Sequence, residues 1–226
     1  MNTILKRREA HAKLMSDPFT ISIHGCGGTG TAVLQGVVKI SRALQKLGHK
    51  GINIKLCDPD TVSESNVIRQ GFSPVDVGQN KALILERRYN QFYGDVDISS
   101  MGIDIPGAIA ISCVDSKRAR KSLLDNYETT FGQVYFYDCG NANRTGQVMV
   151  SPLSVLDVDR LTTGRESNKP SCSASESLAT QDLFVNQMAA TLVCSHLWNF
   201  LRHGEYRTWN DLYFDLKSMS VVTRIK

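Results

Sequence analysis

The sequence predicts an α/β fold in which an open, mostly parallel sheet is Rossmann-like, carries helices on both faces and ends in a C-terminal β-hairpin. Segments rich in β-formers alternate with segments of helical period along the chain, which is typical of βαβ units. The first expected strand also runs directly into a glycine turn that a helical segment follows, as in nucleotide-binding folds. The 226 residues are expected to form a single domain, because no repeat or linker divides them.

The elements follow from periodicity and breakers. Residues 1–18 are expected to form a short helix or arm, and FTISIHG at 19–25 is expected to be the first strand. Apolar residues then recur at helical spacing over 29–47. The other expected elements are a strand at 51–58, a polar loop at 59–80, helices at 80–93, 116–128 and 175–202, strands at 95–103, 108–114, 133–138 and 146–151, a crossover loop at 154–173, and the hairpin from 211 onward.

Composition indicates an ordinary globular protein, with 42% hydrophobic residues, 21% charged residues and a net charge of +4. No run of about 18 apolar residues occurs, so no membrane partner is expected. The N-terminus lacks the apolar core of a secretory signal, which predicts a cytoplasmic location. Most basic residues are scattered along the chain, and no nucleic-acid partner is predicted.

The glycine turn is the first candidate site. Gly25, Gly27 and Gly30 match the pattern GxGxxG, with Gly28 between them. The first glycine permits the tight turn, the second lets a phosphate approach the backbone, and the third lets helix and strand pack closely. The N–H groups at the start of the helix favour an anion. Asp58 ends the next strand, where a carboxylate can accept hydrogen bonds from a ribose.

The turn alone does not separate ATP from NAD, but the following loop does. Asn66, Arg69, Gln70 and Lys81 follow Asp58 closely, and a dehydrogenase has no need for such a group. Attack of a carboxylate on the α-phosphorus of ATP builds negative charge on phosphoryl oxygens, which fixed cations stabilise. Arg offers a planar fork and Lys a compact charge for this purpose.

This stretch closely resembles the ThiF/MoeB/HesA family, the bacterial relatives of ubiquitin-activating enzymes. The family pattern DxDxVxxSNxxRQ, followed by GQxK, is present at 58–70 and 78–81. The resemblance implies that Asp58 holds the ribose and that Asn66, Arg69 and Lys81 contact the phosphates. It places Gln70 in a supporting role.

The resemblance also implies a metal site and a partner. Asp115 stands in a Cys-x-Asp pattern at 113–115, where the family holds Mg²⁺. Magnesium bound by one or two carboxylates and ATP phosphates is the usual coordination. The implied reaction adenylylates the C-terminal carboxylate of a small ubiquitin-like or sulfur-carrier-like protein, with Arg69, Lys81 and Asp115 as catalytic residues.

The chain departs from the family in several places. Its six cysteines form no CxxC pair, so no zinc is expected. Cys172 on the crossover loop is a candidate nucleophile for a later thioester or acyl-persulfide step, against a plain loop cysteine. Arg7 or Arg8 is a candidate for the arginine that enters a neighbouring subunit in a homodimer, against a solvated helix face. Within the family, the chain is most similar to the ThiF-type protein of PRTRC plasmid gene clusters.

Three other functions stay open at this point. An enzyme of the same class would adenylylate another carboxylate, such as that of a peptide or of a tRNA-attached threonylcarbamoyl group, and substrate trials separate these. An NAD(P)-dependent oxidoreductase would use the same glycine turn, and an ATP-against-NADH titration separates it from an ATP enzyme. A nucleotide-binding interaction protein without catalysis would keep the turn but show no ATP–pyrophosphate exchange.

Overall fold

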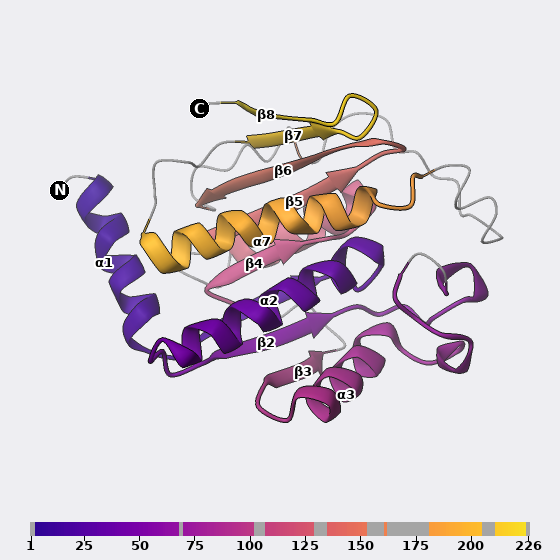
Figure 1. Ribbon diagram of the computed structural model, residues 1–226, viewed down its shortest axis with the longest axis horizontal. Coiled ribbons are helices and arrows are strands. Elements are labelled where there is room, and N and C mark those ends of the chain that lie inside the picture. The colour runs from indigo at the N-terminus through magenta and orange to yellow at the C-terminus, as the bar shows by residue number, and fades with distance from the viewer. Residues whose placement is uncertain are drawn as a thin grey trace.

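The computed structural model describes residues 3–67, 70–101, 107–128, 135–152, 161, 181–204 and 211–224. Within these ranges eight strands form one sheet in the order β3-β2-β1-β4-β5-β6-β7-β8 (Figure 1). The strands are β1 (Phe19–His24), β2 (Ile52–Cys57), β3 (Asp97–Met101), β4 (Ile109–Ser112), β5 (Tyr135–Asn141), β6 (Thr145–Pro152), β7 (Asp211–Asp215) and β8 (Ser220–Arg224). The helices are α1 (Thr3–Ser16), α2 (Gly28–Lys46), α3 (Lys81–Tyr93), α4 (Lys117–Glu128) and α7 (Val185–His203), with 3₁₀ turns η1 (Glu64–Asn66) and η2 (Pro74–Asp76).

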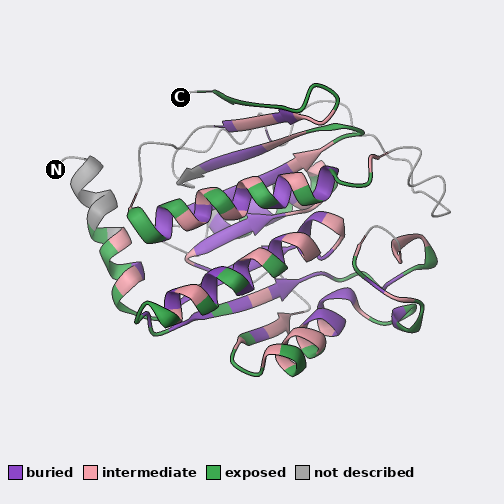
Figure 2. Ribbon diagram, in the orientation of Figure 1, coloured by how far each residue is buried: buried purple, intermediate pink, exposed green. Residues whose placement is uncertain are grey.

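The sheet confirms the predicted architecture and adds a detail to it. Strands β3, β2, β1, β4 and β5 pair in parallel, whereas β6, β7 and β8 join them as antiparallel strands. The C-terminal hairpin β7–β8 is therefore part of the same sheet rather than a separate appendage. Strand β8 lies at its exposed edge (Figure 2).

Two apolar layers sandwich the sheet because strand side chains alternate between its faces. Ile21 and Ile23 of β1 pack in the large core beneath α2, which also receives α7. Helices α2 and α7 lie side by side over this face, with their buried stripes turned inward (Figures 1 and 2). On the opposite face, residues of α4 pack on Phe136 of β5 in a second cluster.

A buried cluster of hydrogen-bonded polar side chains lies among the apolar residues of that second face. Ser22 and His24 of β1 face α4, where the Tyr127 hydroxyl lies 2.6 Å from Ser22 Oγ and 3.0 Å from His24 Nε2. The Gly107 backbone N–H donates to the same hydroxyl at 3.3 Å. His24 is thus a packed structural residue, which follows from its position on a buried strand.

The long helix near the C-terminus begins later than its periodicity predicts. Residues 181–184 are not helical, and α7 starts at Val185. The chain before it is bonded elsewhere: the Asp182 N–H donates to the Asn143 carbonyl at 2.8 Å, and Gln181 Nε2 donates to Asn141 Oδ1 at 2.6 Å. These bonds to the β5–β6 turn compete with helix formation, so the predicted start at 175 is wrong for the described residues.

No helix among the described residues combines the length and the apolar character that a bilayer span would require.

Candidate nucleotide-binding and adenylylation site

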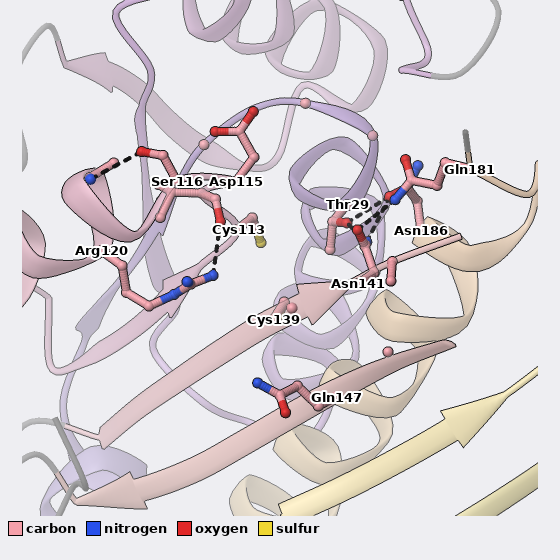
Figure 3. Close-up of a pocket in the computed structure, with 18 of the residues that line it drawn as sticks. Thr29, Cys113, Asp115, Ser116, Arg120, Cys139, Asn141, Gln147, Gln181 and Asn186 are labelled. Atoms are coloured by element: carbon pink, nitrogen blue, oxygen red, sulfur yellow. Dashed lines mark hydrogen bonds between the residues drawn. The ribbon is translucent and has the colours of Figure 1, made fainter. Parts of the chain in front are cut away.

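A large open cleft runs along the carboxyl ends of the parallel strands. Its volume is about 1290 Å³. Strand order reverses between β1 and β4, and in open α/β sheets a ligand crevice forms at such a switch point. Residues that directly follow β1 and β4, together with residues of β2, β5 and the antiparallel strands, line the wall (Figure 3).

The glycine turn lines this cleft, and each of its glycines is required for a different physical reason. Gly25 has φ +89°, and a Cβ there would lie 2.8 Å from the Cys113 carbonyl oxygen. A Cβ on Gly30 would lie 1.8 Å from the Gly25 carbonyl oxygen, so only glycine lets α2 approach β1 this closely. A Cβ on Gly27 would lie 3.7 Å from Gln70 Oε1, which is an ordinary van der Waals contact. Gly27 and Gly28 therefore leave backbone accessible at the start of α2.

Asp58 stands beside the turn at the end of β2. Its Oδ2 accepts the Cys26 backbone N–H at 2.5 Å, and its Oδ1 accepts the Asp60 N–H at 2.8 Å. Burial raises the pKa of Asp58 above its ordinary value, while the two N–H donors and nearby Lys81 act in the opposite direction. Each carboxylate oxygen keeps a further acceptor site, which a ribose hydroxyl can use.

Lys81 is the first residue of α3 and lines the same cleft. Its side chain is only 10% exposed, and Nζ donates to Asp60 Oδ2 at 3.1 Å. Asn80 fixes this helix start, because its Oδ1 accepts the Leu83 N–H at 3.0 Å. Since Asp60 is 67% exposed, the ammonium group is anchored on one side and retains donors for a second anion.

The structure does not bring all predicted phosphate ligands together. Gln70 lines the cleft, and its Oε1 is buried without a hydrogen-bond partner. Asn66 does not line the cleft. Its Oδ1 accepts the Ser63 N–H at 3.0 Å and closes a capping box around η1. Arg69 lies outside the described residues, so its predicted role stays a prediction.

Asp115 follows β4 and projects into the cleft as an exposed side chain (Figure 3). Helix α4 takes its N-terminal hydrogen bond from Ser116, whose Oγ accepts the Ala119 N–H at 3.1 Å. The carboxylate of Asp115 is therefore not used as that cap. No group of three or more His, Cys, Asp and Glu side chains suited to a metal occurs in the described ranges. A magnesium ion here would rest on Asp115 and on ligands that the nucleotide brings.

Arg120 stabilises the segment that carries Asp115, and sequence reasoning missed this role. Its Nε donates to Asp138 Oδ1 at 2.6 Å and its Nη2 donates to the Val114 carbonyl at 3.1 Å. Ser112 Oγ donates to the same Asp138 oxygen at 2.8 Å. Burial raises the pKa of Asp138, and the Arg120 charge opposes that rise. The only sequence signal was a basic helix after a strand, which is usually a solvated face.

A polar cluster at the other side of the glycine turn was also missed. Thr29 Oγ1 donates to Asn186 Oδ1 at 2.9 Å, and Asn141 Nδ2 donates to both of these oxygens at 2.8 and 2.9 Å. Gln181 extends the cluster through its bond to Asn141. All four residues line the cleft (Figure 3). The four side chains come from α2, β5, α7 and the segment before α7, and they form no local motif, so their proximity could not be predicted from the sequence.

Three further candidates fall outside the described part of the chain. Cys172 and most of the predicted crossover loop at 154–173 lie there, as do the side chains of Arg7 and Arg8 on α1. Their predicted roles stay predictions.

The comparisons with known proteins match this geometry at the level of the fold. Escherichia coli MccB solved with ATP has a TM-score of 0.65 and 18% identity, covering 100% of this chain and 72% of MccB. The same enzyme with MccA-N7isoASN has a TM-score of 0.66 and 17% identity over the same shares. SeMet PaaA has a TM-score of 0.64 and 13% identity, covering 98% of this chain and 80% of PaaA. At these identities the likeness establishes the fold.

No curated protein sequence matches the chain. The model of the ThiF family, in contrast, matches residues 8–223, which is nearly the full sequence. The match includes every described strand and the whole cleft, with only the last residue of β8 beyond it. The chain therefore belongs to the ThiF family.

Proposed function

We propose that this chain is an ATP-dependent adenylyltransferase that converts the C-terminal carboxylate of a small ubiquitin-like or sulfur-carrier-like protein into an acyl-adenylate. The observation that carries the proposal is the convergence of an accessible glycine turn, a buried ribose acceptor at Asp58 and a nearly buried ammonium at Lys81 on one cleft. A dinucleotide site needs the first two of these features but not the third. Membership of the ThiF family supports the same reaction class.

The proposed reaction is a displacement at the α-phosphorus of ATP. A carboxylate oxygen of the acyl donor forms a bond to that phosphorus, and the bond to the oxygen that bridges to the β-phosphate breaks. Pyrophosphate leaves with the electron pair, and an acyl-AMP anhydride stays bound. Lys81, together with Arg69, neutralises the charge that develops on the phosphoryl oxygens. Asp58 orients the ribose. The Gln70 side-chain oxygen lies beside Gly27 without a hydrogen-bond partner and can accept a hydrogen bond from a donor group of the bound nucleotide.

Magnesium fits this proposal through Asp115. An exposed carboxylate at the end of a strand, held in place by the Arg120 bond to Val114, suits an ion that takes its other ligands from phosphates and water. When bound, the ion would neutralise charge on the phosphates. Asn66, in contrast, is better explained as the cap of η1 than as a phosphate ligand.

The identity of the carboxylate is a finer part of the proposal. MccB was solved with N-formylated MccA and with ATP, so a peptide carboxylate is the closest alternative to a ubiquitin-like protein. A PRTRC subtype, a later acyl transfer to Cys172 and a homodimer that uses Arg7 or Arg8 are further parts that rest on the family resemblance. A nucleotide-binding protein without catalysis is the alternative outside enzymes.

ATP–pyrophosphate exchange tests the proposed function. Purified chain is incubated with Mg²⁺, ATP, labelled pyrophosphate and a ubiquitin-like β-grasp protein ending in Gly-Gly, with a neighbouring gene's product as first choice. Exchange is expected only when that protein carries its free C-terminal carboxylate. Asp115→Ala is expected to slow exchange at least about tenfold, whereas Asp125→Ala on the exposed face of α4 is the matched control.

Full exchange in Asp115→Ala would show that the magnesium assignment is wrong. Binding of NADH in preference to ATP would contradict the whole proposal, and ATP binding without exchange in response to any ubiquitin-like protein or peptide would favour the non-catalytic alternative.

A further inference from the structure

The amide of Asn186 is an unusual feature of the cleft wall. Asn186 is 3% exposed and sits in the first turn of α7. Its Oδ1 accepts hydrogen bonds from Thr29 and Asn141, which fixes the side-chain amide so that Nδ2 faces the other way. Nδ2 has no hydrogen-bond partner. A buried donor left without an acceptor is costly, and such groups in native proteins call for an explanation.

The surroundings of this donor favour an anionic acceptor. Helix α7 begins beside it, and its N-cap residue Phe184 makes no side-chain cap and its first turn holds no acidic side chain. The Asp182 carboxylate before the helix accepts the Phe184 N–H at 3.4 Å and forms an ion pair with Arg144. Helix α2 begins at Gly28 next to Thr29, again without a side-chain cap. Two helix N-termini, each with a partial positive charge, therefore meet where the Nδ2 donor lacks a partner.

The order of strands in the sheet indicates which ligand supplies the acceptor for Asn186 Nδ2. Along the carboxyl edge, Asp58 follows β2, the glycine turn follows β1, Asp115 follows β4, and Asn141 ends β5. The ribose acceptor thus lies on one side of the phosphate turn and the amide cluster lies on the other. Beyond the cluster, the cleft continues along β6, β7 and β8. A nucleotide that uses Asp58 leaves this second half of the cleft open for the acyl donor.

We propose that Asn186 is a substrate-binding residue for the acyl donor: its Nδ2 donates a hydrogen bond to an oxygen in the last residues of the incoming polypeptide and so positions the terminal carboxylate beside the α-phosphate. This inference rests on the proposed function and adds to it the direction from which the carboxylate arrives. Thr29 and Asn141 act as positioning residues because they orient the Asn186 amide, and Gln181 supports them through its bond to Asn141.

The test separates binding of the acyl donor from binding of ATP. The acyl-donor probe is a synthetic peptide ending in Gly-Gly with a free carboxylate, assayed by ATP–pyrophosphate exchange, and ATP alone is titrated by calorimetry. Asn186→Ala is expected to raise the KM for the peptide roughly 10- to 100-fold, the worth of a hydrogen bond to a charged group. Its Kd for ATP is expected to stay within about threefold of the wild-type value.

Two further variants distinguish loss of the Nδ2 donor from a general loss of stability. Asn186→Asp keeps an oxygen for the Thr29 and Asn141 donors but replaces the free donor with a carboxylate oxygen, so the peptide KM is expected to rise more than the ATP Kd. Gln187→Ala, the exposed amide that follows on α7, is the matched control and is expected to change neither. If Asn186→Ala lowers the melting temperature and weakens binding of both peptide and ATP, that variant reports on folding. The peptide KM and the ATP Kd of Asn186→Asp then test the inference in its place.

Three results would overturn the inference. An unchanged peptide KM in both Asn186 variants would make the amide purely structural. A weakened Kd for ATP with an unchanged peptide KM would assign the donor to a phosphate oxygen instead. A wild-type chain that shows no exchange with the peptide or with a ubiquitin-like protein would remove the proposed function itself, and the inference with it.

Discussion

At the scale of single residues, the glycine turn combines two requirements that the sequence pattern does not separate. Gly30 is needed because a Cβ there would overlap the Gly25 carbonyl oxygen at 1.8 Å, whereas Gly27 has room for a side chain and an ordinary backbone conformation, with φ −74°. The first is a requirement of packing. The second is a requirement of the ligand, because a methyl group at Gly27 would stand where a phosphate approaches the backbone.

Paired substitutions can therefore separate stability from binding. Gly30→Ala is expected to lower the free energy of unfolding by about 1–3 kcal/mol, the usual cost of overpacking, as measured by urea denaturation. Gly27→Ala is expected to cost about 1 kcal/mol or less but to weaken ATP binding at least about tenfold in a calorimetric titration. Equal effects of the two substitutions on both measurements would contradict this division of roles.

At the scale of elements, the loop between β2 and α3 is held by a partly buried ion pair. Arg88 Nη2 donates to Asp76 Oδ2 at 2.5 Å, and Arg88 Nη1 donates to the Gly71 carbonyl at 2.8 Å. The Ser73 N–H and hydroxyl bond the same Asp76 oxygen at 2.7 and 2.9 Å. Burial alone would raise the pKa of Asp76, but these donors and the Arg88 charge lower it overall. They also hold the backbone next to Gln70 in place.

Arg88→Ala is expected to lower the free energy of unfolding by about 1–2 kcal/mol at pH 7. A carboxylate with a lowered pKa stabilises the fold above its unfolded-state pKa, and this contribution is lost as the pH falls through the folded-state value. The difference between wild type and variant should therefore shrink as the pH falls below 3.8, the ordinary pKa of an aspartate side chain. Arg42→Ala removes a half-exposed pair with Asp95 and is expected to cost less than about 0.5 kcal/mol.

A loss of stability from Arg88→Ala that did not depend on pH would show that Arg88 acts by packing alone.

Sequence periodicity was most informative for elements whose bonds are local. The strand 19–24 and the helix 28–46 fall within a residue or two of the expected positions, because each fits one unbroken pattern. Helix α7 departs from its pattern since Gln181 and Asp182 bond the β5–β6 turn instead of continuing the helix. The 3₁₀ turns η1 and η2 were hidden in a polar loop, where capping boxes depend on single Ser, Asn and Asp side chains.

The residues of the candidate site also fall into those that the sequence could identify and those that it could not. Residues that belong to a contiguous motif, such as the glycines, Asp58 and Lys81, could be singled out from sequence, and all of these except Gly30, which packs beneath the turn, line the cleft. Asn141, Asn186 and Arg120 could not, because their function depends on strand order and helix packing that no short pattern encodes. Asn66 shows the converse: it is a motif position whose Oδ1 accepts a local backbone hydrogen bond, and its predicted contact with phosphate stays a prediction.

At the scale of the whole molecule, the sheet order gives the proposed nucleotide and the proposed acyl donor different parts of the cleft. The parallel half supplies the nucleotide side of the cleft, and the antiparallel strands β6, β7 and β8 extend the wall beyond it. Alternating strands and helices predicted the parallel half. Strands β5 and β6 pair across a short turn, whereas the antiparallel pairing of β6 with β7 depends on contacts between distant segments, which the sequence pattern left open.

The central claim is that cationic side chains at positions 69 and 81 converge on the triphosphate of a nucleotide seated over the glycine turn. A crystal structure of the chain with Mg²⁺ and a non-hydrolysable ATP analogue tests it most directly. The expected result places Lys81 Nζ and the Arg69 guanidinium within about 2.7–3.2 Å of phosphate oxygens, with the ribose at Asp58. Phosphates bound at the turn while both cations point away from them would contradict the claim.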